Sequence, residues 1–314
     1  MQVPLQLIRA ISDRVSEGTA PAARALAEEL LSRYGESVQA VLFYGSCLRT
    51  GDTDGLIDLY VLVDEYRSIP GAQRWSYRLI RPTVFYLELP FEGRVLRSKY
   101  AVLTLAEFER GTSRQWFHSY LWARFAQPVG VPYARNDPAR ERVHHALGQA
   151  VLTFHSRVLP MLPPRCDARE LWERGLMLSY RAELRAERPA TVTGLFDAAP
   201  AYYQQLTALA MASLPWASEV LTGAQPARYH IRISTRTRLL CRTAWATRRL
   251  QGKLLSILRL GKGLITFRGG LDYILWKIER HSGVTVELAP RLRRHPLLAR
   301  GVLFWRLYRR GAFR

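Results

Sequence analysis

The sequence predicts a mixed α/β domain, followed by a helical domain and a basic helical C-terminal region. Before residue 105, short apolar runs rich in β-branched and aromatic residues alternate with Gly and Pro, which is typical of strands. From residue 105 onward the apolar residues recur at helical spacing, and the last part of the chain is rich in Arg. Pro and Gly near residue 135 mark a boundary. We therefore expect domains at residues 1–135, 136–225 and 226–314.

The first domain is predicted to contain one helix and four strands. Residues 21–34 have helical apolar spacing after a Pro, which is tolerated at the first helical position. Residues 41–44 and 56–63 are apolar runs on either side of a Gly-Ser loop. Two further runs follow at residues 83–91 and 95–105. This order indicates a mixed sheet with connecting helices.

Helices are expected after these strands. The apolar spacing predicts them at residues 105–108, 116–125, 140–159, 168–187 and 198–211, with a Pro-Ala-Thr turn at residue 189. His144 and His145 are expected to be an exposed helical pair, because the seven histidines have no metal-ligand spacing. The second domain is thus predicted to be helical, closing over the first.

The positive charge lies in the last part of the chain. Residues 228–314 hold 21 of the 46 Lys and Arg residues but only three acids. Aliphatic and aromatic residues accompany this charge at residues 254–267 and 301–310, which suits an interfacial helix on anionic lipid. Nucleic acid is disfavoured as a partner, because phosphate contacts do not need aliphatic neighbours. A packed helical subdomain with a basic exterior is the alternative.

The expected location is the cytoplasm, on the inner face of a bacterial cell membrane. The three cysteines have neither disulfide-framework nor metal-ligand spacing, which favours a reduced compartment. No apolar run reaches 18 residues, so no transmembrane helix is expected. The first 13 residues resemble neither a secretory signal nor a transit peptide. A peripheral association through residues 226–314 is therefore expected.

A carboxylate interrupts the strand at residues 56–63. Asp58 lies in an otherwise apolar run, and its burial is costly unless a metal ion, Arg or Lys meets it. Gly45 and Ser46 leave the preceding strand, where backbone amides and a hydroxyl can approach a phosphate chain. A simple turn is the alternative for this pair. Together the three residues indicate a phosphate site.

This arrangement resembles the signature of polymerase-β-type nucleotidyltransferases. In that superfamily a Gly-Ser loop holds a triphosphate, and carboxylates on the next strand bind a divalent metal. Two acids one residue apart are usual there, whereas Leu56 stands at the first position here. Either the protein is inactive or a second carboxylate comes from elsewhere, and Asp54 and Glu88 are acids in this region. The resemblance implies a nucleotidyltransferase-like α/β domain.

Further motifs in order resemble the mitochondrial-type phosphatidate cytidylyltransferases of the translocator assembly and maintenance family. That family has a single acid at the position of Asp58. The similarity continues through Lys99-Tyr100-Ala101-Val102, Tyr120, Arg124, Pro128-Val129 and Leu178 to Arg185. Cys47, Ala123, Gln127, Ala182 and Glu183 depart from its pattern, although Glu183 keeps a carboxylate. The resemblance covers most of residues 40–210.

The resemblance implies CTP:phosphatidate cytidylyltransfer, with Mg²⁺ as cofactor and CTP, phosphatidic acid and an anionic membrane surface as partners. It implies Asp58 and Glu183 as catalytic and metal-binding residues. The substrate-binding residues that it implies are Gly45, Ser46, Lys99, Arg124, Tyr180 and Arg185. If the resemblance is set aside, Lys99 is equally well explained as a residue at a strand edge that reaches water, and Glu183 as a charged residue on the solvated face of a helix. Glu88 is expected to face solvent.

Two other functions remain open from the sequence. One is nucleotidyl transfer to RNA or to a small hydroxylated molecule. The other is a degenerate nucleotidyltransferase that acts as a membrane or RNA adaptor, which the missing acid at Leu56 favours. Labelling of phosphatidate or of RNA from CTP distinguishes these functions.

Overall fold

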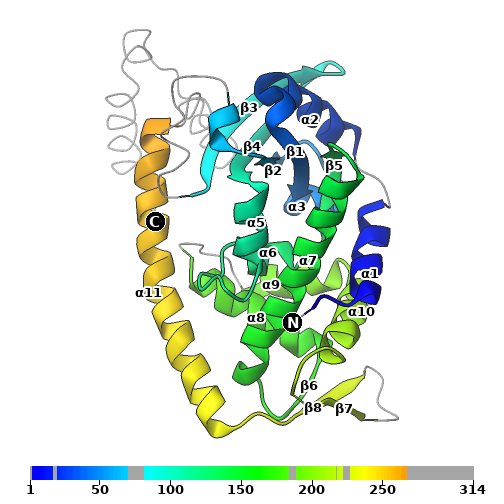
Figure 1. Cartoon of the computed structure of the whole chain (residues 1–314), viewed down its shortest axis with the longest axis vertical. Coiled ribbons are helices and arrows are strands. Elements are labelled where there is room, and N and C mark those ends of the chain that lie inside the picture. The colour runs from blue at the N-terminus through cyan, green and yellow to red at the C-terminus, as the bar shows by residue number, and fades with distance from the viewer. Residues whose placement is uncertain are drawn as a thin grey trace.

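The computed structural model describes residues 2–16, 20–69, 81–183, 189–216, 218–221 and 227–266. Its centre is a mixed five-stranded sheet in the order β3-β4-β2-β1-β5 (Figure 1). β2 and β4 are parallel, and the other neighbours are antiparallel. The strands are β1 (Val38–Tyr44), β2 (Leu56–Val63), β3 (Thr83–Phe91), β4 (Arg94–Thr104) and β5 (Gly130–Ala134). The predicted mixed α/β class is confirmed, and β5 is a strand that the sequence analysis missed.

Alternation along the strands gives the sheet two apolar faces. Val41 and Val61 point to the face covered by α2 (Pro21–Tyr34), whereas Leu42 and Leu62 point to the opposite face. On this second face lie α5 (Leu105–Thr112), α6 (Trp122–Phe125) and α7 (Asp137–Val158) (Figure 1). Alternate residues of a strand point to the same face, so the side chain of Asp58 projects from the same face of the sheet as Leu62, which is the face that α6 covers. The short α3 (Ser46–Thr50) joins β1 to β2.

The helical layer continues below the sheet. It contains α1 (Leu5–Ser16), α8 (Ala168–Arg181), α9 (Pro189–Asp197) and α10 (Pro200–Met211). α1 packs against α7 and α10, although it lies at the other end of the sequence. A second, three-stranded sheet has the order β6-β8-β7, with β6 (Arg165–Asp167), β7 (Ser218–Leu221) and β8 (Arg228–Ile231). In the described ranges, single turns of 3₁₀-helix lie at Gly35–Ser37, Tyr66–Ser68 and Leu159–Met161.

Several helix predictions were wrong in detail. The helix expected at 116–125 is confined to Trp122–Phe125, because Ser113 forms a turn after α5 by donating to the Arg110 carbonyl and accepting from the Gln115 amide. The expected turn at residue 189 is the start of α9, where Pro occupies the first position. His144 is 6% exposed on the core side of α7, so the histidines are not an exposed pair.

The C-terminal region expected to be helical from residue 226 begins instead with strand β8, and one long helix follows, α11 (Thr235–Thr266). Its inner face carries Trp245, Arg248 and Gly252, all buried against the body of the protein. The Arg248 guanidinium lies over the rings of Phe117 (4.4 Å to the centroid) and Trp245 (5.1 Å). In the part of the chain that the structure describes, no helix is long and apolar enough to cross a membrane. Residues 267–314 of the predicted C-terminal region lie outside the described residues.

Candidate active site

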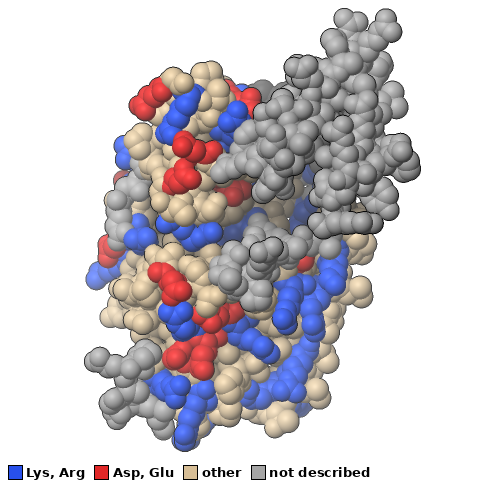
Figure 2. Space-filling view, turned by 180° about the vertical axis from the view of Figure 1, so that it is seen from behind, with Lys and Arg blue, Asp and Glu red and all other residues tan. Residues whose placement is uncertain are grey.

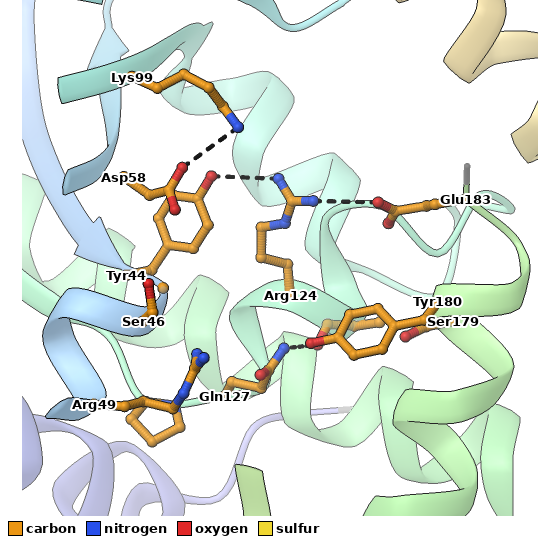
Figure 3. A pocket seen from close by; sticks show the side chains of 13 residues that line it. Tyr44, Ser46, Arg49, Asp58, Lys99, Arg124, Gln127, Ser179, Tyr180 and Glu183 are labelled. Carbon is orange, nitrogen blue, oxygen red and sulfur yellow. Dashed lines mark hydrogen bonds and ion pairs between the residues drawn. The ribbon is translucent and has the colours of Figure 1, made fainter. Parts of the chain in front are cut away.

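A polar cavity of about 440 Å³ lies where the sheet meets α6 and the end of α8 (Figure 3). It contains residues from the β1–α3 junction, from β2 and β4, and from the two helices. The lining residues are Tyr44, Gly45, Ser46, Arg49, Asp58, Lys99, Ala123, Arg124, Gln127, Pro128, Ser179, Tyr180 and Glu183. The structure thus brings together every predicted site residue that it describes. Arg185 lies outside the described residues.

The Gly-Ser loop is in direct contact with the strand carboxylate. Gly45 has φ 93° and ψ −162°, a backbone conformation that is accessible essentially only to Gly. A Cβ atom at this position would lie 2.7 Å from Oδ2 of Asp58. The register of β1 and β2 explains the contact, since Tyr44 pairs with Asp58. Glycine at position 45 therefore permits both the backbone conformation of the turn and the close approach of the loop to Asp58.

Lys99 is the cation that meets Asp58. The parallel register of β2 and β4 places Asp58 directly beside Lys99, and Nζ of Lys99 lies 3.5 Å from Oδ1 of Asp58. Both side chains remain partly exposed to the cavity, at 33% for Lys99 and 22% for Asp58. β4 lies between β3 and β2, so the interpretation of Lys99 as a strand-edge residue was wrong. The predicted cationic partner for the strand carboxylate is confirmed as a lysine.

Arg124 is the buried cation of the cavity. It donates hydrogen bonds to the hydroxyl groups of Tyr44 and Tyr60, both at 3.4 Å. Its Nη2 lies 3.3 Å from Oε2 of Glu183, and these side chains are 7% and 10% exposed. Burial opposes the guanidinium charge, but the surrounding tyrosine oxygens and Glu183 outweigh it and raise the pKa of Arg124 well above its usual value. Arg124 therefore keeps its charge in the cavity.

Tyr120 connects Arg124 to α11. The guanidinium of Arg124 lies 4.2 Å from the Tyr120 ring centroid, and that of Arg259 on α11 lies 4.0 Å from it. Burial alone would raise the pKa of Tyr120, but these two guanidinium groups outweigh it and lower the pKa to about 8. Tyr120 is thus an unusually acidic phenol between the cavity and α11.

Glu183 reaches the cavity because α8 ends at Arg181. The amides of Ala182 and Glu183 donate to the carbonyls of Ser179 and Tyr180, which closes the helix in a turn. The predicted continuation of this helix through residue 183 was wrong. With 10% of its side chain exposed and Arg124 as its partner, Glu183 is not a solvated helix charge.

Several lining residues were not predicted as site residues, and Arg49, Ser179 and Gln127 are three of them. Arg49 comes from α3, three residues beyond Ser46, and a basic residue so close to the Gly-Ser loop was the available signal. Ser179 lies one residue before Tyr180 on α8. Gln127 lines the cavity and donates to the Ala123 carbonyl at 3.2 Å, although the family pattern has Lys at this position.

Asp58 and Glu183 are carboxylates, which is the kind of side chain that binds Mg²⁺. Mg²⁺ commonly binds through one or two carboxylates together with substrate phosphates, and Asp58 and Glu183 both line the cavity. Of the other acids considered, Asp54 pairs with Arg94 at 2.6 Å and Glu88 with Arg97 at 3.2 Å, and neither lines this cavity. Among the described residues, no cluster of three or more His, Cys, Asp or Glu residues is placed to hold a metal ion. Asp58 and Glu183 as metal ligands stay a prediction.

Comparison with known proteins finds no protein family model that matches the chain, and no curated protein that matches it. The resemblance to the phosphatidate cytidylyltransferases therefore depends on the short motifs in the sequence. The geometry of the cavity bears on the function independently of that resemblance.

Proposed function

We propose that this protein is a CTP:phosphatidate cytidylyltransferase, which forms CDP-diacylglycerol and pyrophosphate at a membrane surface. One observation carries the proposal: the Gly45-Ser46 loop touches the carboxylate of Asp58 and opens into a cavity that also contains Lys99 and Arg124. Transfer from a nucleoside triphosphate requires a loop that can approach the phosphates closely, a carboxylate that can hold a divalent metal, and cations that stabilise the phosphate charge. This cavity combines all three kinds of group. The family motifs supply the choice of CTP and phosphatidate.

The cations of the cavity suit the triphosphate. Ser46, Arg49 and Lys99 line the cavity, in which the Gly45 turn brings the backbone close to Asp58. Arg124 is buried and always charged, so it can stabilise negative charge that develops on the transferring phosphoryl group. When bound at Asp58, Mg²⁺ would neutralise the phosphate charge of the nucleotide and of the leaving pyrophosphate.

The proposed reaction needs no strong general base. An oxygen of the phosphatidate monoester attacks the α-phosphorus of CTP and forms a new P–O bond. The bond between the α-phosphorus and the bridging oxygen breaks, and pyrophosphate leaves with its electron pair. The attacking monoester is already ionised near neutral pH, because its second pKa is about 6. The protein therefore contributes mainly the position of the two substrates and electrostatic stabilisation.

The outer face of α11 suits a membrane surface. Large apolar side chains are exposed along one side of this helix, opposite the buried Trp245 and Arg248. They are Leu239, Leu240, Leu250, Leu254, Ile257 and Leu258, which we call the apolar stripe. Lys and Arg side chains gather along the side of the molecule that α11 occupies (Figure 2). An amphipathic helix with this composition is typical of proteins that lie on anionic lipid.

The test of the function is transfer of label from CTP. Purified protein is incubated with Mg²⁺, α-phosphate-labelled CTP and either phosphatidate liposomes or RNA. We expect label in CDP-diacylglycerol, with stoichiometric pyrophosphate. Label in RNA, or no labelled product with either acceptor, would contradict the proposal.

The test of the apolar stripe is liposome sedimentation. The double variant Leu250→Ser/Leu254→Ser should bind phosphatidate liposomes at least tenfold more weakly, because burial of each leucine is worth about 1.5 to 3 kcal/mol. The matched control is Leu5→Ser, at a 72% exposed leucine on α1. Equal sedimentation of the stripe variant and the control would refute this role of α11.

A further inference from the structure

A second cavity, of about 220 Å³, adjoins the active-site cavity and is called the side cavity below. Arg49 and Pro128 line both cavities, so the two meet at these side chains. Figure 3 shows Arg49 on the side of the active-site cavity that lies opposite Lys99. The other residues that line the side cavity are Arg14, Val15, Leu48, Val129, Gly130, Leu195, Ala198, Ala199 and Tyr203.

Most of the side cavity's wall is apolar and comes from elements far apart in the sequence. Val15 belongs to α1, Leu48 to α3 and Leu195 to α9, and Val129 directly precedes β5. Val129 is part of the Pro128-Val129 pair among the sequence motifs, to which no role has yet been assigned. Apolar walls with a few polar groups are typical of sites that bind a ring-shaped ligand group.

One polar group in this wall is buried without a partner. Tyr203 on α10 is 0% exposed, and its hydroxyl has no hydrogen-bond partner among the described residues. Its ring packs against Trp172 and Phe196, with centroids 4.6 Å and 5.6 Å away. Burial raises the pKa of Tyr203, and the positive charges of Arg49 and Arg14 partly oppose this rise. Both arginines line the side cavity, so the hydroxyl end of the side chain lies near it.

An unpaired buried hydroxyl is costly, and a ligand with a polar edge would remove that cost. The hydroxyl of Tyr203 can both donate and accept a hydrogen bond. An acyl chain of the lipid acceptor would fill the apolar walls but would leave this hydroxyl unpaired. A nucleobase has apolar faces for the walls and an edge of donors and acceptors for the hydroxyl, so it matches the side cavity better.

We propose that the side cavity binds the base of the nucleotide, with the hydroxyl of Tyr203 hydrogen-bonded to the polar edge of the ring. The inference rests on the proposed function, in which the phosphates of CTP occupy the neighbouring cavity. Arg49 lines both cavities, so it would lie beside the part of the nucleotide that joins the base to the phosphates.

The test compares CTP with inorganic tripolyphosphate, which has the phosphates but no base. The full-length wild type and Tyr203→Phe are titrated calorimetrically with each ligand in the presence of Mg²⁺. Tyr203→Phe should bind CTP about tenfold more weakly and tripolyphosphate with unchanged affinity, because only the hydrogen bond to the base is lost. Its urea midpoint should not fall, since the hydroxyl has no partner in the described part of the fold. The matched control is Tyr229→Phe, at a buried tyrosine of β8 that lines neither cavity.

A second variant narrows the side cavity. Ala198 lines it at an exposed position, so Ala198→Phe adds a large side chain outside the core. This variant should also bind CTP about tenfold or more weakly and tripolyphosphate as the wild type does. Ala212→Phe, the same change at an exposed residue directly after α10, is its control.

The outcomes separate the base subsite from the proposed function. Wild-type affinity of Tyr203→Phe for CTP, or a parallel loss of affinity for CTP and tripolyphosphate, overturns the subsite. A raised KM for a short-chain phosphatidate with unchanged CTP binding also overturns it and assigns the side cavity to the acyl chains. The function is upheld in each case if the wild type makes CDP-diacylglycerol. A wild type that makes none, while Tyr203→Phe loses affinity for CTP alone, overturns the function and supports the subsite.

Discussion

The substitution Gly45→Ala tests whether the contact between the Gly-Ser loop and Asp58 is required. The new Cβ would lie 2.7 Å from Oδ2 of Asp58, and an ordinary contact begins at about 3.4 Å. The carboxylate must therefore retreat, or the loop must open. A displacement approaching 1 Å in an active site costs about 100-fold in rate. The backbone conformation at residue 45 adds strain of about 1 to 3 kcal/mol when a Cβ is present.

Gly51→Ala is the matched control for this prediction. Gly51 also has a positive φ, at 71°, but a Cβ there would meet nothing within 4 Å. Its substitution should cost about 1 to 2 kcal/mol in the free energy of unfolding and leave turnover near the wild-type value. Urea denaturation gives the stability of both variants, and transfer of label from CTP to phosphatidate gives their rates. If Gly45→Ala retained the rate of Gly51→Ala, the contact with Asp58 would have no part in catalysis.

Four further changes test the site and its surroundings. Asp58→Asn should lower turnover at least 100-fold without unfolding the protein, whereas Asp64→Asn, one residue beyond the far end of the same strand, should have no effect on the rate. Glu183→Gln should lower turnover by about tenfold or more through loss of an ion pair that is almost entirely buried, and unchanged turnover and Mg²⁺ dependence would show that this acid is dispensable. Gly252→Ala should destabilise the protein by about 1 to 3 kcal/mol in urea denaturation, because its Cβ would overlap the carbonyl oxygen preceding Glu183. Tyr120 should titrate near pH 8 in ultraviolet difference spectra. Its lowered pKa stabilises the fold fully above pH 10, and this contribution is lost as the pH falls through 8, so Tyr120→Phe should abolish this part of the pH dependence.

The positions of β1 to β4 were predictable because each of these strands contains a short apolar run between Gly, Pro or polar residues, whereas β6, β7 and β8 have no such run and were not predicted. The predicted runs at 56–63 and 83–91 coincide with β2 and β3. β5 was missed because Gly130, Pro132 and Tyr133 do not form an apolar run, and this strand pairs at the edge of the sheet beside β1. Pairing with β1 at the edge, rather than local propensity, explains such a strand.

The contacts in the site were harder to predict than its members. The need for a cation near Asp58 followed from burial, but the identity of Lys99 depends on a parallel pairing of β2 with β4 that joins residues 41 positions apart in the sequence. The position of Glu183 depends on where α8 ends, and helix periodicity alone extended that helix too far. The contact of Arg259 on α11 with Tyr120 was not predictable, because it exists only in the tertiary structure.

The two ion pairs in the cavity have a consequence for its selectivity. Lys99 is held by Asp58, and Arg124 by Glu183, so each cation already has an anion attached to the same chain. Such a tethered anion competes at an effective concentration that dilution cannot lower. A lone phosphate group can replace one carboxylate at a time and gains little by the exchange. On the proposed function, a chain of phosphates would displace both carboxylates together, so the two ion pairs would favour binding of polyphosphates over monophosphates and inorganic phosphate.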